Sequence, residues 1–238
     1  MLTQAKRHTP ASSLLAVITE FRALPARDLE EIGQRCQWRN AAAGDVVLRY
    51  QDGGDSVFFI VQGTIRLTHY SRSGHEVILG DLCAGEMFGE LAAIDGQRRS
   101  ATGVARTDAL LAAMPAAAFR ELIHANHQIA VAILRRLAGQ VRRLTERVFD
   151  FSTLAVRNRI HAALLRLAQD QMTGPNQATI TPAPTHIDLA NMISTHREAV
   201  TRELNELVRA DLIRREEHRI VILDLARLRR MVQEARGW

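Results

Sequence analysis

The hydrophobic residues in the middle of the chain follow a heptad repeat. Between about residues 126 and 151, apolar side chains recur at alternating steps of four and three, a spacing that keeps them on one narrow seam facing a partner helix. The seam consists of Ala130, Leu134, Leu137, Val141, Leu144, Val148 and Phe151. A helix of this extent is roughly 37 Å long, which is more than a small domain needs to close its own core.

The positions between the seam residues are mostly charged, so we expect the other faces of this helix in solvent. They carry Arg135, Arg136, Arg142, Arg143, Glu146 and Arg147. A helix packed only on its own domain usually shows a wider apolar stripe, and that alternative stays open. The narrow seam favours a two-stranded coiled coil with a second copy of the chain, and therefore a homodimer.

On the N-terminal side of the long helix, the pattern predicts two short helices, at residues 12–22 and 25–35, followed by a β region. Between Gly44 and Gly103, short β-rich runs alternate with glycine turns. The predicted strands span residues 46–50, 57–62, 64–70 and 76–79. Regularly spaced short strands with turn signals are typical of an antiparallel sandwich or barrel. We expect one compact β-roll, with helices resuming after Pro115.

On the C-terminal side, the pattern predicts two short helices separated by a tight turn. Thr185 with Asp188, and Thr195 with Glu198, each place an acidic residue three positions after a hydroxyl residue, which indicates a capped helix start. The inner faces carry Leu189, Ala190, Ile193, Val200, Leu204 and Leu207. This arrangement is a helix-turn-helix, whose second helix presents its outer face to the DNA major groove.

The turn and the segment that follows complete this second region. Ser194 stands where such turns often have glycine, so we expect either backbone strain or a slightly different turn. A short strand is predicted at residues 178–181, a hairpin wing at 216–223, and a final basic helix at 224–235.

Together these patterns predict an α+β protein. It has an N-terminal antiparallel, jelly-roll-like β-roll, a long dimerisation helix, and a C-terminal winged helix-turn-helix. We expect residues 1–125 to form the β-roll domain with flanking helices, 126–152 the dimerisation helix and hinge, and 153–238 the DNA-binding domain.

Composition narrows the classes of function only a little. The net charge of +5 comes almost entirely from arginine, with Lys6 the only lysine, and is too modest by itself to identify a nucleic-acid binder. Cys36 and Cys83 are the only cysteines, which excludes a disulfide framework and any four-cysteine zinc or iron–sulfur site. So few cysteines fit a reducing, cytoplasmic compartment. No segment approaches the length of a membrane span, so we expect no membrane contact.

The segment from residue 87 to 104 groups side chains that suit a nucleotide. Gly89 allows close approach of a ligand to the backbone, and the turn beginning at Leu91 offers amide groups to an anion. Arg99 and Ser100 add a guanidinium and a hydroxyl for a phosphodiester, while the Glu90 carboxylate can accept a hydrogen bond from a sugar hydroxyl. The alternative is that Glu90 and Arg99 form only a structural ion pair.

The outer face of the second helix of the helix-turn-helix carries side chains that suit DNA bases. Near its N-terminus lie His196, Arg197, Glu198, Thr201 and Arg202. Arginine can bond O6 and N7 of guanine, and glutamate can accept from the cytosine amino group. A solvated charged surface would explain the same residues on an isolated helix.

These two motifs, on this pattern and in this order, resemble the cyclic AMP receptor protein family, also called the catabolite activator and FNR superfamily. The resemblance runs from about Leu15 to Ile222 and includes FGEL followed by RSA at the family's spacing. It implies that Gly89 and Ser100 contact a cyclic phosphate, that Arg99 pairs with its charge, and that Glu90 binds the ribose 2′-hydroxyl, with Leu91 beside them.

For DNA, the resemblance implies that Arg197 and Arg202 read guanines and that Glu198 reads a cytosine, in half-sites similar to TGTGA and its inverted complement. It further implies that Leu144 and Thr145 meet the purine. Family members that bind cyclic AMP can have a threonine–serine pair there, so one hydroxyl is missing and cyclic GMP stays open as the ligand.

The leading hypothesis is a homodimeric transcription regulator that binds cyclic AMP and then a palindromic DNA site, with RNA polymerase as a further partner. The alternative is a regulator of the same fold that is constitutive or senses cyclic GMP, cyclic di-GMP, haem or a gas, since nine histidines leave haem open. We expect no metal site, and the chain has no P-loop, GxSxG or HExxH motif, so we do not expect an enzyme.

Overall fold

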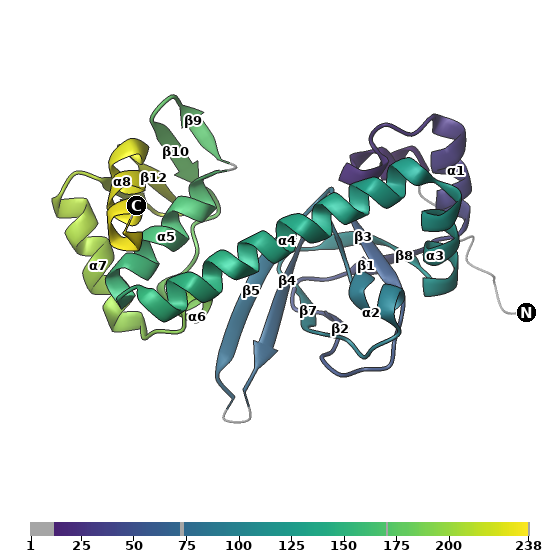
Figure 1. The fold of residues 1–238 in the computed structure, drawn as a ribbon, viewed down its shortest axis with the longest axis horizontal. Coiled ribbons are helices and arrows are strands. Elements are labelled where there is room, and N and C mark those ends of the chain that lie inside the picture. Colours follow the sequence, from purple (N-terminus) through teal and green to yellow (C-terminus); the bar gives the residue numbers. More distant parts are fainter. Residues whose placement is uncertain (1–11, 72–73, 170, 238) are drawn as a thin grey trace, which may run out of the picture. The chain divides into compact units, whose positions relative to one another are not determined.

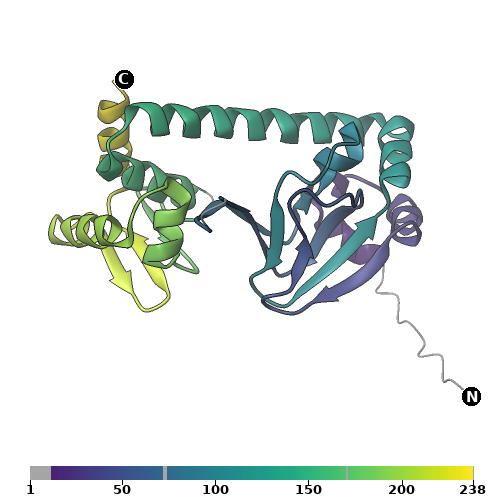
Figure 2. The same ribbon diagram turned by 90° about the horizontal axis from the view of Figure 1, so that it is seen from below.

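The computed structural model describes residues 12–71, 74–169 and 171–237, and its elements are labelled in Figure 1. The chain divides into two compact units, the first within residues 1–74 and 78–138 and the second within 75–77 and 139–238. The boundary falls inside the long helix α4, His127–Thr153, which is continuous over 27 residues (Figure 2). Residues 1–11 of the predicted β-roll domain lie outside the described residues.

The first unit contains the predicted β-roll with helices around it. Its elements are η1 Ser12–Val17, η2 Thr19–Phe21, α1 Ala26–Gln34, β1 Gln37–Ala41, β2 Val46–Leu48, β3 Val57–Gln62, β4 Thr64–Tyr70, β5 Glu76–Cys83, β6 Met87–Phe88, α2 Glu90–Asp95, β7 Thr102–Ala105, β8 Ala109–Met114 and α3 Ala116–Ala125. They form two four-stranded sheets, with strand orders β1-β8-β3-β6 and β2-β7-β4-β5.

Strand β3 shows how the core of this unit is built. Its apolar run is buried on both faces, because Phe58 and Ile60 pack toward the second sheet while Val57 and Phe59 pack toward the helices. The helical side is closed by η1, α1, α3 and the first turns of α4. A strand covered on both sides is expected to be continuously apolar rather than alternating, as this one is.

Several elements of the first unit differ from the sequence prediction, since β1, β6, β7 and β8 were not among the predicted strands and β5 continues to Cys83. Residues 12–22 form two 3₁₀ helices rather than one α-helix, and the buried Leu15, Ile18 and Phe21 recur at steps of three, the 3₁₀ period. Strand β8 was not predicted because its sequence, ALLAAM, has high helix propensity. Tertiary pairing with β1 and β3 on its two sides overrides that preference.

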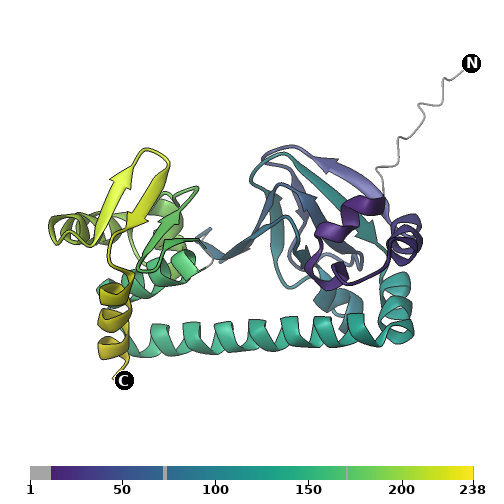
Figure 3. The same cartoon turned by 90° about the horizontal axis from the view of Figure 1, so that it is seen from above.

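The second unit contains the winged helix-turn-helix, whose hairpin is visible in Figure 3. Its elements after α4 are α5 Val156–Gln169, β9 Met172–Gly174, β10 Gln177–Ile180, α6 His186–Ile193, α7 Arg197–Arg209, β11 Ile213–Glu216, β12 Arg219–Ile222 and α8 Leu225–Arg236. The strands form one sheet in the order β11-β12-β10-β9. The wing hairpin begins at Ile213, three residues before the predicted start.

The core of the second unit contains the predicted inner faces of both helices. Leu189, Ala190, Ile193, Val200, Leu204 and Leu207 are all buried in one cluster. Asp188 donates its backbone N–H to the Thr185 hydroxyl at 3.0 Å, which confirms the first predicted cap. The second predicted cap is wrong, because α7 is preceded by His196 rather than Thr195 and no side chain caps its start.

Helix α4 carries most of the predicted seam on its exposed surface. Leu134, Val141, Leu144 and Val148 are 64%, 62%, 55% and 65% exposed, whereas Ile129 and Ile133 on another face are buried in the first unit. Two arginines predicted to be solvated are not. Arg136 donates to the Met87 carbonyl at 2.6 Å and Arg147 to the Met192 carbonyl at 3.2 Å.

Candidate functional site

The predicted phosphate-binding residues meet at the start of α2 in the first unit. Gly89 follows β6 and has a left-handed backbone with φ of +80°. Its carbonyl accepts a hydrogen bond from Nη1 of Arg99 at 2.9 Å, while Nη2 of Arg99 donates to the Ser56 carbonyl at 2.8 Å. The guanidinium also lies over the Phe58 ring, 5.9 Å from its centroid. Arg99 is only 4% exposed, so this cradle holds its side chain in one place.

Glycine is required at position 89 for two reasons. A left-handed backbone is costly for residues with a Cβ. A Cβ on Gly89 would also lie 2.6 Å from Nη1 of Arg99 and 3.0 Å from the Ser56 carbonyl oxygen. Gly89 and Arg99 are therefore joined by a hydrogen bond, and the guanidinium also packs against the Cα of Gly89 too closely for a side chain at position 89.

The electrostatic surroundings of Arg99 are acidic. Burial lowers the pKa of the Arg99 guanidinium, and the carboxylates of Asp55, Glu90 and Asp52 act in the opposite direction. The guanidinium stays charged, because the pKa of an arginine lies far above neutral pH. Glu90, the first residue of α2, is buried beside it, while Ser100 is exposed directly after it.

Several residues of this site were not predicted from the sequence. Ser56 contributes a backbone carbonyl, which no side-chain motif reveals, and Phe58 was predicted only as part of a strand. Gly54 approaches Arg99 closely, since a Cβ there would lie 3.6 Å from Nη2, and the Gly-Gly turn before β3 was its only sequence signal. Leu91 is exposed on α2.

The predicted purine contacts lie on the part of α4 that belongs to the second unit. Leu144 is exposed, and the Thr145 hydroxyl donates to the Val141 carbonyl one turn back at 3.0 Å. The structure thus brings Gly89, Glu90, Arg99 and Ser100 together, and describes Leu144 and Thr145 separately from them.

Four of the five predicted DNA-contacting residues, all except His196, line a groove of about 520 Å³ along α7. Arg197, Glu198 and Arg202 are exposed there, whereas Thr201 is half-buried. The Thr201 hydroxyl donates to the Arg197 carbonyl at 3.0 Å and lies 2.7 Å from Nδ1 of His186. His196 is exposed at the position before the helix.

The tight turn between α6 and α7 has the strain expected of a non-glycine residue. Ser194 adopts φ of +50° and ψ of +63°, a left-handed conformation. Its N–H still caps α6 by donating to the Ala190 carbonyl. The turn therefore keeps the geometry that glycine would give, at a cost of about 1 to 2 kcal/mol for serine.

Recognition helix α7 is fixed to α5 by a buried polar contact that was not predicted. Nε2 of His161 on α5 lies 2.6 Å from the Glu203 carboxylate on α7, and Arg157 donates to the same oxygen at 3.1 Å. Burial lowers the pKa of His161, outweighing the raising effect of Glu203. A neutral His161 therefore donates its Nε2–H to Glu203, and the pair fixes the position of α7 along α5.

Residues 12–71, 74–169 and 171–237 lack two kinds of feature, a metal-binding cluster and a membrane-spanning helix. Within them no cluster of three histidine, cysteine or acidic side chains is arranged to hold a metal ion. No helix in the same ranges is both long and apolar enough to cross a membrane.

Comparison with known proteins matches each unit to a domain family. Residues 38–126 match the cyclic nucleotide-binding domain, and residues 158–231 match the Crp-like helix-turn-helix domain. The chain is 32% identical over 197 residues to the transcriptional regulator SdrP of Thermus thermophilus, covering 82% of this chain and 93% of that protein. It is 29% identical over 193 residues to the cAMP-activated global transcriptional regulator Vfr of Pseudomonas aeruginosa, covering 79% and 89%.

A solved structure supports the same fold. The c-di-GMP-responsive global regulator CLP of Xanthomonas campestris aligns with a TM-score of 0.68 and 21% identity, covering 83% of this chain and 99% of that chain.

A cyclic-nucleotide-binding domain followed by a Crp-like helix-turn-helix defines a ligand-responsive, DNA-binding transcription regulator. The chain belongs to the CRP/FNR family of transcription regulators, whose members are dimeric and are not enzymes.

Proposed function

We propose that this protein is a homodimeric transcription regulator that binds cyclic AMP through its β-roll and then binds a TGTGA-like palindrome. The observation that carries the ligand assignment is the Arg99 cradle. An arginine side chain has five N–H donors, and bonds to the carbonyls of Gly89 and Ser56 use only two of them. The remaining donors are held in place for a phosphate.

The other contacts of the proposed nucleotide site follow from the same turn. Gly89 and Ser100 contact the cyclic phosphate, Glu90 accepts from the ribose 2′-hydroxyl, and Leu91 packs beside them. Leu144 and Thr145 meet the purine. Vfr is named as cAMP-activated, which favours cyclic AMP as the ligand here.

The proposed dimer forms through the seam of α4. Four of its apolar residues are more than half exposed in the single chain: Leu134, Val141, Leu144 and Val148. A second copy would bury them, together with Ala130, Leu137 and Phe151, in a two-stranded coiled coil. Removing such side chains from water contributes about 25 cal/mol per Å² of apolar area.

The proposed mechanism is a population shift. The nucleotide binds more tightly to the dimer in which both α7 helices lie one DNA turn, about 34 Å, apart. In that state Arg197 and Arg202 read guanines, Glu198 reads a cytosine, and His196 and Thr201 lie beside them. The working division remains residues 1–125 for ligand binding, 126–152 for dimerisation and 153–238 for DNA.

The proposal places the protein in the cytoplasm, where the chromosome is, with RNA polymerase as a further partner. A second candidate function is supported by Leu144, which offers the purine no hydrogen bond. In that case the same dimer responds to cyclic GMP, cyclic di-GMP, haem or a gas, or binds DNA constitutively. CLP, whose fold is shared, is named as c-di-GMP-responsive.

Titration calorimetry with cyclic AMP, cyclic GMP and cyclic di-GMP tests the ligand assignment. Wild-type protein is expected to bind cyclic AMP most tightly, and Arg99→Ala to lose that binding while remaining a folded dimer by light scattering. Arg98→Ala is the matched control, because Arg98 is exposed and donates to the Gln51 carbonyl rather than to the carbonyls of Gly89 and Ser56. Equal cyclic AMP affinity in wild type and Arg99→Ala would sink the assignment.

A further inference from the structure

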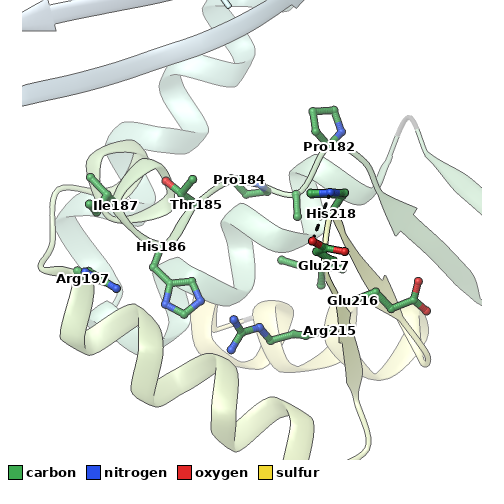
Figure 4. A pocket seen from close by; sticks show the side chains of 12 residues that line it. Pro182, Pro184, Thr185, His186, Ile187, Arg197, Arg215, Glu216, Glu217 and His218 are labelled. Atoms are coloured by element: carbon green, nitrogen blue, oxygen red, sulfur yellow. Dashed lines mark ion pairs between the residues drawn. The ribbon is translucent and has the colours of Figure 1, made fainter.

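A second cavity lies beside the recognition helix, between α6, the start of α7 and the β11–β12 wing (Figure 4). Its volume is about 590 Å³. We call it the wing cleft, and define it by His186, Arg197, Arg215 and the wing residues Glu216, Glu217 and His218. Of these residues, the sequence motifs account only for Arg197.

Three basic side chains converge on the wing cleft. Figure 4 shows the His186 ring between the side chains of Arg197 and Arg215. Burial lowers the pKa of His186, and the charges of Arg215 and Arg197 lower it further. These arginines are thus close enough to disfavour a positive imidazole, and His186 is neutral at pH 7.

The acidic residues of the wing are directed to other partners. Glu216 pairs with Arg219 at 2.7 Å and with Arg214 at 3.3 Å, and Glu217 lies 3.9 Å from His218. Within the described ranges of the chain, neither Arg197 nor Arg215 has an acidic partner at ion-pair distance. Glu216 and Glu217 also line the cleft, but Arg197 and Arg215 have no carboxylate at ion-pair distance among the described residues, so an anion placed beside these two arginines relieves their repulsion.

The hydrogen bonds of His186 determine which of its nitrogens titrates. The Thr201 hydroxyl donates to the Arg197 carbonyl at 3.0 Å, so it accepts from Nδ1 of His186 at 2.7 Å. The neutral ring therefore carries its proton on Nδ1. Nε2 is left to take up the second proton when a negative group arrives.

We propose that the wing cleft holds one backbone phosphate of the DNA duplex that α7 reads, between His186 and Arg215, and that His186 becomes protonated on binding. Arg197 stays with the bases and adds to the local positive potential. The occupant is DNA because the groove along α7 and the wing cleft share Arg197, so a duplex on α7 brings its backbone to the cleft.

This inference rests on the proposed docking of α7 in the major groove. A phosphate contact carries no sequence information but makes DNA binding salt-dependent. The logarithm of the DNA association constant falls with the logarithm of the salt concentration, with a slope of about −0.9 for each neutralised phosphate. A coupled protonation makes binding pH-dependent, approaching tenfold per pH unit for each protomer. The charges that act on His186 are those of Arg215 and Arg197, and Glu216, Glu217 and His218 line the same cleft.

The test measures binding of a fluorescent duplex with the TGTGA palindrome, in saturating cyclic AMP, across salt concentration and from pH 8 to pH 6. Arg215→Ala is expected to flatten the salt slope by about 0.9 per protomer, on both this duplex and one of scrambled sequence. Arg214→Ala, its neighbour on β11, is the matched control because its guanidinium is already paired with Glu216.

The pH arm uses His186→Gln, with His124→Gln on α3 as the control for an exposed imidazole elsewhere. Wild type and His124→Gln are expected to bind DNA more tightly as the pH falls, and His186→Gln to lose that gain. Unchanged salt slope in Arg215→Ala, or unchanged pH dependence in His186→Gln, overturns the inference and leaves the proposed function standing. If wild type binds neither duplex, both fail together.

Discussion

The two glycines that flank α2 allow backbone strain to be separated from damage to the nucleotide site. Gly89 and Gly96 both have left-handed backbones, with φ of +80° and +71°. A Cβ on Gly89 would meet Nη1 of Arg99 at 2.6 Å, whereas a Cβ on Gly96 would have nothing within 4 Å. Gly89→Ala and Gly96→Ala therefore make the same chemical change and differ in what the new methyl group touches.

The expected magnitudes follow from these surroundings. Gly96→Ala costs only the left-handed penalty, about 1 to 2 kcal/mol. Gly89→Ala costs the same penalty plus about 1 to 3 kcal/mol for crowding, and the guanidinium must move away from its two carbonyls. Since a hydrogen bond to a charged group contributes about 1.5 to 3 kcal/mol, displacement of Arg99 should weaken nucleotide binding at least about tenfold.

Two assays measure these effects. Urea unfolding followed through Trp38, in a Trp238→Phe background, reports the stability of the first unit, because Trp38 lies in β1. Calorimetry with cyclic AMP reports the site. We expect Gly96→Ala to bind like wild type and Gly89→Ala to bind weakly. Equal affinities for the two variants would refute the view that the Arg99 cradle forms the phosphate site.

Three further predictions concern the second unit. Ser194→Gly should raise the free energy of unfolding by about 0.5 to 1 kcal/mol. The relief of left-handed strain in the folded protein exceeds the extra conformational entropy that glycine has in the unfolded chain. A lower stability of this variant in urea would count against strain at Ser194. Glu198→Ala should reduce discrimination at one base pair by about 1 to 3 kcal/mol, and an unchanged ranking of single-base operator variants would contradict that role. Because the folded-state pKa of His161 is lowered, protonation favours unfolding, so stability is held above about pH 6.5 and falls below it. His161→Gln keeps a donor for Glu203 and should flatten that fall, and pH profiles identical to wild type would exclude this contribution.

Features set by local pattern were predictable from the sequence. The steps of four and three predicted the long helix, and the structure has it at His127–Thr153. The Thr185 cap and the buried faces of α6 and α7 follow from spacing in the same way. For Ser194 we expected either backbone strain or a slightly different turn, and its φ of +50° shows the first.

Features set by tertiary context were not predictable. The alanine-rich sequence of β8 has a high helix propensity, and it forms a strand because it pairs with β1 on one side and β3 on the other. Arg136 was assigned to solvent because its position lies off the seam, but a carbonyl of β6 lies within its reach. The carbonyl of Ser56 belongs to the Arg99 site, yet backbone groups leave no mark on a side-chain motif.

The contact between His161 and Glu203 also depends on tertiary structure and was not predictable from the sequence. Each residue looks like an exposed polar position on its own helix, and only the crossing of α5 and α7 brings them to 2.6 Å. The wing cleft likewise joins residues from α6, α7 and β11 that are far apart in sequence. Groups of residues like these are brought together by packing between helices and strands. The spacing of apolar residues along one element does not predict that packing.

The central claim is that a cyclic nucleotide held by Arg99 controls DNA binding by α7. Fluorescence anisotropy of a duplex with the TGTGA palindrome tests it directly, with wild type and Arg99→Ala measured with and without cyclic AMP. The account predicts that the nucleotide strengthens binding of the wild type and leaves Arg99→Ala unchanged. Equal DNA affinity of the wild type in the two conditions, or an equal response of both proteins to the nucleotide, would contradict it.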